Sequence, residues 1–257
     1  MTVDRRGFFK LAGLGALGLA GARSLPVLGN PLPSPSPPES GPPSGVRWGM
    51  VVDLRACLND EGCQDCILAC DHAHNIPQLP DRKHEVKWIW KDPYEEVFPM
   101  QAHEYLEDAL RGHPALAFCN HCDNPPCVRV CPTKATFRRE DGLVMMDWHR
   151  CIGCRYCIAA CPYGSRSFNW VDPRPYIEKI DPEFPTRTRG VVEKCNFCDE
   201  RLARNEQPAC VAACRNGALT FGNLADPTST VRLLLKSRYS IRRKPSLGTH
   251  PEVFYLV

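Results

Sequence analysis

The stretch CIGCRYCIAACP, residues 151–162, decides how this chain folds. Its cysteines follow the spacing C-x2-C-x2-C-x3-C-P, which is typical of ligand runs for [4Fe–4S] clusters. The first three cysteines of such a run wrap one face of a cluster. The fourth comes where the chain turns helical, so its sulfur is directed to a different cluster. One run of this kind therefore predicts a partner run.

The partner run lies directly upstream, in CNHCDNPPCVRVCP, residues 119–132. Between the two runs, ATFRREDGLVMMD at residues 135–147 predicts a β-hairpin that turns at Asp141 and Gly142. Run, hairpin and run together predict a two-cluster ferredoxin-like fold whose halves exchange their fourth ligands. His121 lies inside the upstream run, and we expect it to form a hydrogen bond or face solvent, because four cysteines already complete the set.

All 16 cysteines fall into four runs of four. The longest gap inside a run, between Cys198 and Cys210, leaves room for a short helix in DERLARNEQPA. In the first run Asp60 stands where the usual first cysteine would be, and Cys57 lies further upstream. We prefer Cys57 as the ligand because thiolate is the softer donor, and Asp60 is the alternative. The four runs are Cys57, Cys63, Cys66 and Cys70; Cys119, Cys122, Cys127 and Cys131; Cys151, Cys154, Cys157 and Cys161; and Cys195, Cys198, Cys210 and Cys214.

Two other uses of so many cysteines are disfavoured. Exported chains often form disulfides, but thiols two residues apart rarely meet disulfide geometry. Structural zinc sites usually split two C-x2-C pairs across a longer loop, a pattern that only the last run approaches. Residues 71–117 contain no cysteine but hold five histidines, with Trp88 and Trp90, and lack the C-x-x-C-H haem motif. We interpret this segment as an insertion with ordinary histidines and an aromatic core; the histidines are His72, His74, His84, His103 and His113.

The N-terminus has the pattern of an export signal. Arg5 and Arg6 precede an apolar stretch that is too short to span a bilayer, and Ala20-Gly21-Ala22 offers a cleavage site. We prefer the twin-arginine route to an ordinary secretory signal or an uncleaved anchor, because the chain should acquire clusters and fold before it crosses the membrane. A Pro-rich tether follows, and VRWGMVVDL at residues 46–54 predicts the first strand.

Charge argues against a nucleic-acid partner. The formal charge is +3, and removal of residues 1–22 would take away a net +2. Four oxidised clusters, each about −2 with its thiolates, would bring the mature protein to about −7. The basic residues Arg242, Arg243 and Lys244 form a run so short that we expect a solvated face.

The organisation that we expect is an α+β fold of two pseudo-symmetric ferredoxin-like 2[4Fe–4S] units with loop-rich insertions. Its segments are a signal peptide (1–22), a linker (23–46), the first run with its insertion (47–115), a ferredoxin-like core (116–170), and a connector with the fourth run and tail (171–257).

The four runs, the Arg-Arg leader and the ending LGTHPEVFYL together resemble the four-cluster iron–sulfur subunits of the dimethylsulfoxide reductase, polysulfide reductase and formate-dependent nitrite reductase systems. Within that family, HEVKWIW and DWHRCIGCRYCIAACPYG are most similar to the periplasmic iron–sulfur subunit of a sulfite-reduction-associated electron-transport complex. The sequence departs from the family pattern in two places. The gap before Cys63 is longer than usual, and Arg215 stands where the family often has proline. We expect the change at Arg215 to matter little.

The resemblance implies four [4Fe–4S] clusters with nested ligands. Cluster 1 would have Cys57, Cys63, Cys66 and Cys214; cluster 2, Cys119, Cys122, Cys127 and Cys161; cluster 3, Cys151, Cys154, Cys157 and Cys131; cluster 4, Cys195, Cys198, Cys210 and Cys70. It also implies a periplasmic subunit, peripheral to the cytoplasmic membrane, whose partners are an integral-membrane quinone-interacting subunit and a multihaem cytochrome c.

No catalytic constellation or nucleotide-binding fingerprint is present in the sequence. We therefore expect an electron relay without a catalytic site of its own, attached to the membrane only through its partners. The alternatives are electron delivery to a molybdopterin oxidoreductase and, outside redox chemistry, a zinc-stabilised scaffold.

Overall fold

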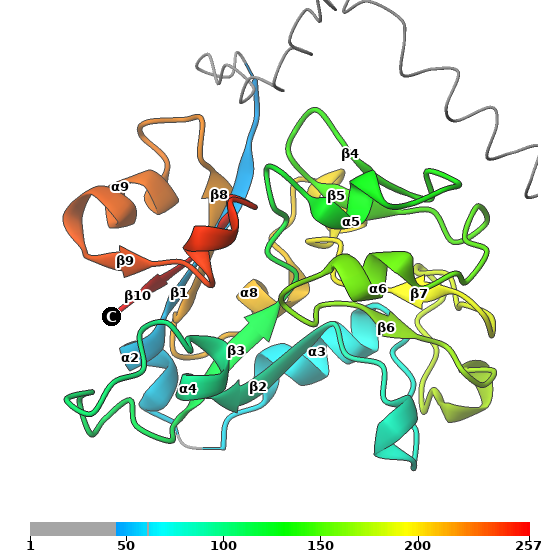
Figure 1. The fold of residues 1–257 in the computed structure, drawn as a ribbon, viewed down its shortest axis with the longest axis horizontal. Helices are drawn as coiled ribbons and strands as arrows, with labels where there is room; N and C mark the ends of the chain where they lie inside the picture. The colour runs from blue at the N-terminus through cyan, green and yellow to red at the C-terminus, as the bar shows by residue number, and fades with distance from the viewer. Residues whose placement is uncertain (1–44, 61) are drawn as a thin grey trace, which may run out of the picture. The chain divides into compact units, whose positions relative to one another are not determined.

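The computed structural model describes residues 45–60 and 62–257. The expected signal peptide and all but the last two residues of the expected linker lie outside the described residues. The described residues combine short helices with small sheets, which confirms the mixed α+β content (Figure 1).

The largest sheet joins the two ends of the described chain. Its central strand β1 (Trp48–Asp53) pairs antiparallel with β8 (Leu219–Asn223) and parallel with β10 (Val253–Leu256), and β9 (Ser240–Ile241) completes the edge beside β10. The first strand expected from the sequence is therefore confirmed. Because side chains alternate along a strand, Met50 and Val52 join the main core, while Val51 joins a smaller cluster on the other face.

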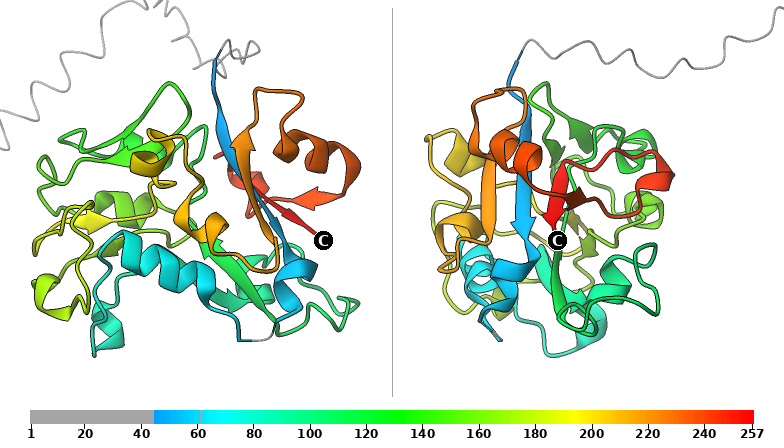
Figure 2. Two further views of the ribbon diagram at one scale, coloured as in Figure 1. Left: turned by 180° about the vertical axis from the view of Figure 1, so that it is seen from behind. Right: turned by 90° about the vertical axis from the view of Figure 1, so that its left-hand side faces the viewer.

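Helix α9 (Thr230–Ser237) covers that other face (Figure 2). Its Val231 is fully buried against Val51, Leu224 and Leu256. The helix begins at Ser229, whose hydroxyl oxygen accepts a hydrogen bond from the backbone N–H of Arg232 at 3.4 Å. The opposite face of the sheet is thereby left to pack against the part of the molecule that carries the cysteines.

Three two-stranded ladders complete the strand content of the described residues. The hairpin of β4 (Thr136–Arg138) and β5 (Val144–Met146) confirms the one expected between the two central runs. Gly142 has a φ of +88°, which only glycine adopts readily, so the turn lies where the sequence placed it. The other ladders pair β2 (Ile89–Pro93) with β3 (Pro114–Phe118) and β6 (Ser167–Phe168) with β7 (Val192–Glu193).

Short helices carry many of the cysteines, and they pack in two pairs. Helix α3 (Asp65–Ala73) contacts α8 (Ala209–Ala212), and α5 (Pro126–Arg129) contacts α6 (Tyr156–Ala160). The helix expected between Cys198 and Cys210 is α7 (Asp199–Leu202). The remaining helices of the described residues are α2 (Leu54–Leu58), α4 (Tyr94–Val97) and the 3-10 turns η1 (Arg82–His84), η2 (Arg174–Tyr176) and η3 (Pro245–Leu247).

The fourth cysteine of each central run lies where a short helix ends, not where the chain turns helical, so that expectation is wrong. Cys161 is the residue at which α6 ends, with an extended backbone (φ −82°, ψ 110°), and Cys131 follows the last residue of α5 by two. Pro132 and Pro162 come next, and the residue before a proline avoids helical geometry. The turn into extended chain, rather than a helical face, sets the direction of these sulfur atoms.

Candidate metal centres

Every cysteine of the sequence lies within the described residues, and all sixteen are free thiols. Among these residues the structure therefore contains no disulfide framework. Most of the thiols are buried or partly buried, and of the sixteen only Cys154 is exposed.

Three cavities are each lined by four cysteines that come from two different runs. In each case three cysteines belong to one run and the fourth belongs to another. Set 1 is Cys57, Cys63, Cys66 and Cys214; set 2 is Cys119, Cys122, Cys127 and Cys161; set 3 is Cys131, Cys151, Cys154 and Cys157.

The four remaining cysteines are also neighbours. Burial first, and then the nearby thiols, raise the pKa of Cys70 well above its ordinary value. We call this group set 4, and it consists of Cys70, Cys195, Cys198 and Cys210. Sets 1 to 4 thus place together the residues that the family resemblance grouped.

The first run contains the position where the sequence left two candidates. Cys57 lines the cavity of set 1, whereas Asp60 does not. The carboxylate of Asp60 lies instead 3.7 Å from Nη1 of Arg215. Burial raises the pKa of Cys57, Lys91 opposes this, and Cys214 lies close enough that its charge adds to the rise.

The four sets follow one another through space. Cys66 of set 1 is among the thiols that, after burial, raise the pKa of Cys210 of set 4. Burial and then Cys119 of set 2 raise the pKa of Cys195 of set 4 to about 12. Burial raises the pKa of Cys157 of set 3, with a further contribution from Cys127 of set 2. Neighbouring thiols therefore connect the sets in the order 1, 4, 2, 3.

The donor sets fit an iron–sulfur cofactor. Each cavity presents four sulfur atoms, and soft thiolates are the usual ligands of iron–sulfur iron. Burial favours the protonated thiol, so a closed group of four thiols becomes a group of thiolates only when bound metal supplies compensating positive charge. Four sulfur ligands also suit zinc, so the donor set alone does not separate the two cofactors.

One glycine is required for the loop of the third run to close. Gly153 has a φ of +68°, and a Cβ atom there would lie 2.4 Å from the carbonyl oxygen of Gly190. No residue with a side chain fits this position without moving the connector that follows. The glycine between Cys151 and Cys154 is therefore needed because the backbone of Gly190, far along the chain, packs against it.

His74 is one of the ordinary core histidines that the sequence predicted, but it also contacts a cysteine of set 4. Its ring stacks on Trp88 with centroids 4.5 Å apart. Its Nδ1 donates to the carbonyl oxygen of Cys70 at 2.9 Å and lies 3.5 Å from that residue's Sγ, while Nε2 lies 3.1 Å from Glu200. The four-residue spacing between Cys70 in α3 and His74 at the end of that helix is a sequence signal for such a contact.

His74, Cys198 and Glu200 also bring one potential metal-ligand atom each within 4.8 Å of one another. Cys198 already belongs to set 4, and both ring nitrogens of His74 have partners. We therefore interpret the His74–Glu200 pair as part of the wall around set 4.

His121 forms hydrogen bonds in the core, and the alternative of a solvent-facing side chain is wrong. The residue is fully buried and stacks on Phe197 with centroids 3.8 Å apart. Its Nδ1 accepts from the backbone N–H of Val144 at 3.1 Å, and Nε2 donates to the carbonyl oxygen of Cys195 at 3.1 Å. One neutral tautomer satisfies both contacts, which agrees with a pKa that burial holds well below 6.5.

Two lysines bring positive charge to the sets. Lys91 lines the cavity of set 1 and donates to the carbonyl oxygen of Cys63 at 2.6 Å. Lys194 is 1% exposed and donates to the carbonyl oxygens of Cys195, at 2.7 Å, and Val144. Within the described part of the chain neither lysine forms an ion pair with a carboxylate. Their charges are therefore available to balance thiolates.

The basic residues of the tail do not form a solvated face, so that expectation is wrong. Arg243 is buried, and its guanidinium lies 5.4 Å from the ring of Tyr163. Lys244 donates to the carbonyl oxygen of Pro162 at 2.6 Å, directly after Cys161. The tail folds back onto the wall of set 2, and a run of three basic residues in the sequence does not predict this contact.

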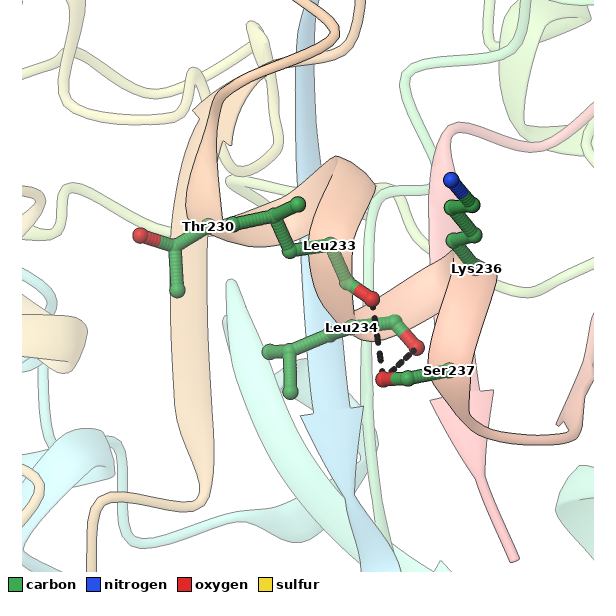
Figure 3. Close-up of a pocket in the computed structure, with 5 residues that line it drawn as sticks. All are labelled: Thr230, Leu233, Leu234, Lys236 and Ser237. Atoms are coloured by element: carbon green, nitrogen blue, oxygen red, sulfur yellow. Dashed lines mark hydrogen bonds between the residues drawn. The ribbon is translucent and has the colours of Figure 1, made fainter.

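A further cavity, of about 450 Å³, lies on α9 and is open to solvent (Figure 3). It is lined by residues of this helix and contains no cysteine. Ser237 Oγ donates to the carbonyl oxygens of Leu233 and Leu234, so its polar group is already paired.

None of the helices in the described residues has the length and apolar character needed to cross a membrane.

Comparison with known proteins identifies the cysteine-rich part of the chain. A family model for a 4Fe-4S dicluster domain matches residues 115–224, which contain the second, third and fourth runs.

Three similar proteins extend the match over most of the sequence. The Hdr-like menaquinol oxidoreductase iron-sulfur subunit 1 of Archaeoglobus fulgidus is 42% identical, over 81% of this chain and 82% of the relative. A polysulfide reductase chain of Wolinella succinogenes is 40% identical, over 81% and 93%. The menaquinone reductase iron-sulfur cluster-binding subunit of Nitratidesulfovibrio vulgaris is 38% identical, over 82% and 89%.

Proposed function

We propose that sets 1 to 4 are the ligand sets of the iron–sulfur clusters of this chain. The reason is that the chain belongs to the family of iron–sulfur electron-transfer subunits of redox complexes. The cofactors are four [4Fe–4S] clusters, and the chain is an electron-transfer subunit rather than the catalytic subunit. When bound, the clusters supply one-electron redox chemistry. The chain supplies the thiolates, the exclusion of water and the surrounding charge.

The observation that carries the ligand proposal is the mixed origin of each set. Cys161 lines the cavity of set 2 although it belongs to the third run, and Cys131 lines that of set 3 although it belongs to the second. In the same way, Cys214 lines the cavity of set 1 although it belongs to the fourth run, and Cys70 belongs to set 4 although it comes from the first run. The two helix pairs, α3 with α8 and α5 with α6, support two pseudo-symmetric ferredoxin-like units.

We infer that the relay follows the order of the sets, from set 1 through 4 and 2 to set 3. Sets 1 and 3 then lie at the two ends of the path. Partly exposed cysteines occur at both ends, since Cys63 of set 1 is partly exposed and Cys154 of set 3 is exposed. Each end can thus approach a partner, whereas the thiols of set 4 are mostly buried.

The physiological setting that we propose is a membrane-associated complex of the sulfite-reduction-associated type, in which this chain is the DsrO-like subunit. Its partners there are an integral-membrane quinone-interacting subunit and a multihaem cytochrome c. Relatives named for menaquinol oxidation and menaquinone reduction support the quinone partner. The Arg5-Arg6 pair supports twin-arginine export to the periplasm, with the segment boundaries expected from the sequence.

Delivery of electrons to a molybdopterin oxidoreductase is the second candidate. The similarity to the polysulfide reductase chain, and to a Halobacterium salinarum protein named for the iron-sulfur subunit of a dimethyl sulfoxide reductase, favours it. The two candidates place the same chain next to different partners.

Purification of the intact complex tests the choice between partners. The complex is isolated from native membranes through a C-terminal tag, and its subunits are identified by mass spectrometry. The first candidate predicts an integral-membrane subunit and a multihaem cytochrome c, and menaquinol should exchange electrons with the clusters. A large pterin-containing subunit in their place would support the second candidate and exclude the first.

A separate variant tests export. Replacement of Arg5 and Arg6 by Lys should leave cluster-loaded protein in the cytoplasm, because the twin-arginine route requires the arginine pair. Undiminished export of this variant would exclude that route.

A further inference from the structure

Arg166 is a buried cation placed beside two of the cysteine sets. The residue is 6% exposed and lines the cavity of set 2. Arginine is almost never fully buried unless it is paired, because removing the guanidinium from water is costly. Its position in the core therefore requires a source of negative charge.

The hydrogen bonds of Arg166 place it between sets 2 and 3. Its Nη1 donates to Oγ1 of Thr136 at 3.0 Å and lies 3.8 Å from Sδ of Met146. Met146 lines the cavity of set 3. The guanidinium thus reaches from the wall of one cavity to the wall of the next.

Among the described residues, no carboxylate compensates this charge. Within residues 45–60 and 62–257, Arg166 forms no ion pair, and its Nη2 is buried without a hydrogen-bond partner. Arg187 provides the contrast, since it is also buried but binds Glu193 at 2.7 Å. The fold therefore pairs the guanidinium of Arg187 with an acid and leaves that of Arg166 beside thiols.

Thiolates are the remaining source of negative charge for Arg166. Arg166 lines the same cavity as Cys119 and Cys127. Burial lowers the pKa of Arg166, but the charges of Cys127, Cys157 and Cys119 more than offset it, so the pKa is raised. Cys127 and Cys119 belong to set 2, and Cys157 belongs to set 3. The same cation therefore faces sulfur atoms of both sets.

We propose that Arg166 raises the reduction potentials of the two clusters held by sets 2 and 3, by holding an uncompensated positive charge between them. The inference rests on the proposed ligand sets. Reduction adds one electron, and so one negative charge, to a cluster without making or breaking a bond. A cation buried beside it stabilises the reduced state more than the oxidised state, and low polarity strengthens the effect.

The test compares reduction potentials in the full-length, cluster-loaded protein. Arg166→Gln removes the charge and keeps a polar side chain. In a titration with dithionite followed by paramagnetic resonance, the equilibrium constant for reducing each of the two clusters should fall by about tenfold or more, which is about 59 mV for a one-electron couple. The clusters of sets 1 and 4 should keep their potentials.

Two control variants isolate the buried charge. Arg166→Lys retains the charge and should keep both potentials close to those of the unmodified protein. Arg129→Gln removes the same charge at an exposed site between Cys127 and Cys131. Because water and salt screen an exposed charge, this variant should shift the potentials much less.

Several results would overturn the inference. These are unchanged potentials in Arg166→Gln, an equal fall at all four clusters, or an equal effect of Arg129→Gln. Loss of a cluster in both Arg166→Gln and Arg166→Met would assign the residue a structural role instead. If the unmodified protein held fewer than four clusters, the ligand sets themselves would fail, which iron analysis detects independently of the potentials.

Discussion

Arg215 and Asp65 form a two-point ion pair, with Nε 2.5 Å from Oδ2 and Nη2 2.7 Å from Oδ1. Arg215 follows Cys214 and Asp65 precedes Cys66, so the pair joins the two chain segments that meet at set 1. The hydrogen bond from Arg215 lowers the pKa of Asp65. The sequence alone predicts little effect of Arg215, but the structure gives this arginine a defined contact with Asp65.

We expect Arg215→Ala to speed the loss of iron from set 1 to a chelator, because Cys214 is then held less firmly against Cys66. Asp65→Asn should have the same effect, and the double variant should be no faster than either single one. The depressed pKa of Asp65 means that the pair is present at every pH above 3.8 and is lost only as pH falls through the folded-state pKa. The effect should therefore be equal at neutral and mildly alkaline pH.

Arg174→Ala serves as the control for this prediction. Arg174 pairs with Asp172, two residues away, and lines none of the three cysteine cavities. Iron loss from set 1 at the same rate in both variants would contradict a specific role for Arg215.

The identity of the first ligand can be tested by counting iron. The unmodified protein should contain iron and acid-labile sulfide approaching about sixteen each per chain, at about four of each per cluster. Cys57→Ser should lower the count at set 1, whereas Asp60→Asn should leave it unchanged, because of these two residues only Cys57 lines that cavity. A full count in Cys57→Ser combined with a reduced count in Asp60→Asn would assign the ligand to Asp60.

Exchange of ligands between the two central runs predicts a crossed effect. Cys161→Ala should damage the cluster of Cys119, Cys122 and Cys127, because Cys161 lines the cavity of set 2. The cluster of Cys151, Cys154 and Cys157 should be spared. We expect the damaged cluster to give either a three-iron signal or no signal.

Cys131→Ala should give the reciprocal result, since Cys131 lines the cavity of set 3. Paramagnetic resonance after redox titration distinguishes the clusters in both variants. Damage confined to the run that carries each substitution would show that the ligands are not exchanged.

Arg47 and Glu252 predict a stability effect that depends on pH. The carboxylate of Glu252 is 5% exposed and pairs with Arg47, whose side chain is 26% exposed. Arg47→Met leaves the acid buried and unpaired at neutral pH. The loss should be on the order of 2 kcal/mol, below the value for a fully buried pair because Arg47 is partly solvated.

Burial raises the pKa of Glu252 above 4.5, and Arg47 partly offsets this. Without Arg47 the pKa of Glu252 rises further. The protonated form of Glu252 then stabilises the folded state at pH values below 4.5. This stabilisation is lost as the pH rises through the pKa of Glu252 in the folded state. The penalty of Arg47→Met should therefore shrink between about pH 7 and about pH 5, measured by guanidinium-induced loss of cluster absorbance. Adding Glu252→Gln should abolish the difference, and an equal penalty at both pH values would contradict the argument.

The spacing of the cysteines determined the cofactor and the family, because a loop that wraps a cubane permits few spacings. The Asp141-Gly142 turn likewise determined the central hairpin, since Gly142 adopts the positive φ that the turn requires. These features depend on residues that are near one another in sequence, so local geometry is sufficient to predict them.

Tertiary structure alone decided which distant charges meet the cysteines. Arg215 reaches Asp65 across 150 residues, and the tail buries Arg243 against Tyr163 although its charge run predicted a solvated face. Nothing in the sequence around Arg166 distinguishes it from an exposed arginine, yet its side chain lines the cavity of set 2. The physical reason is that burial and the partner of a charge are set by which surfaces pack together, and one-dimensional spacing carries no information on contacts between remote segments.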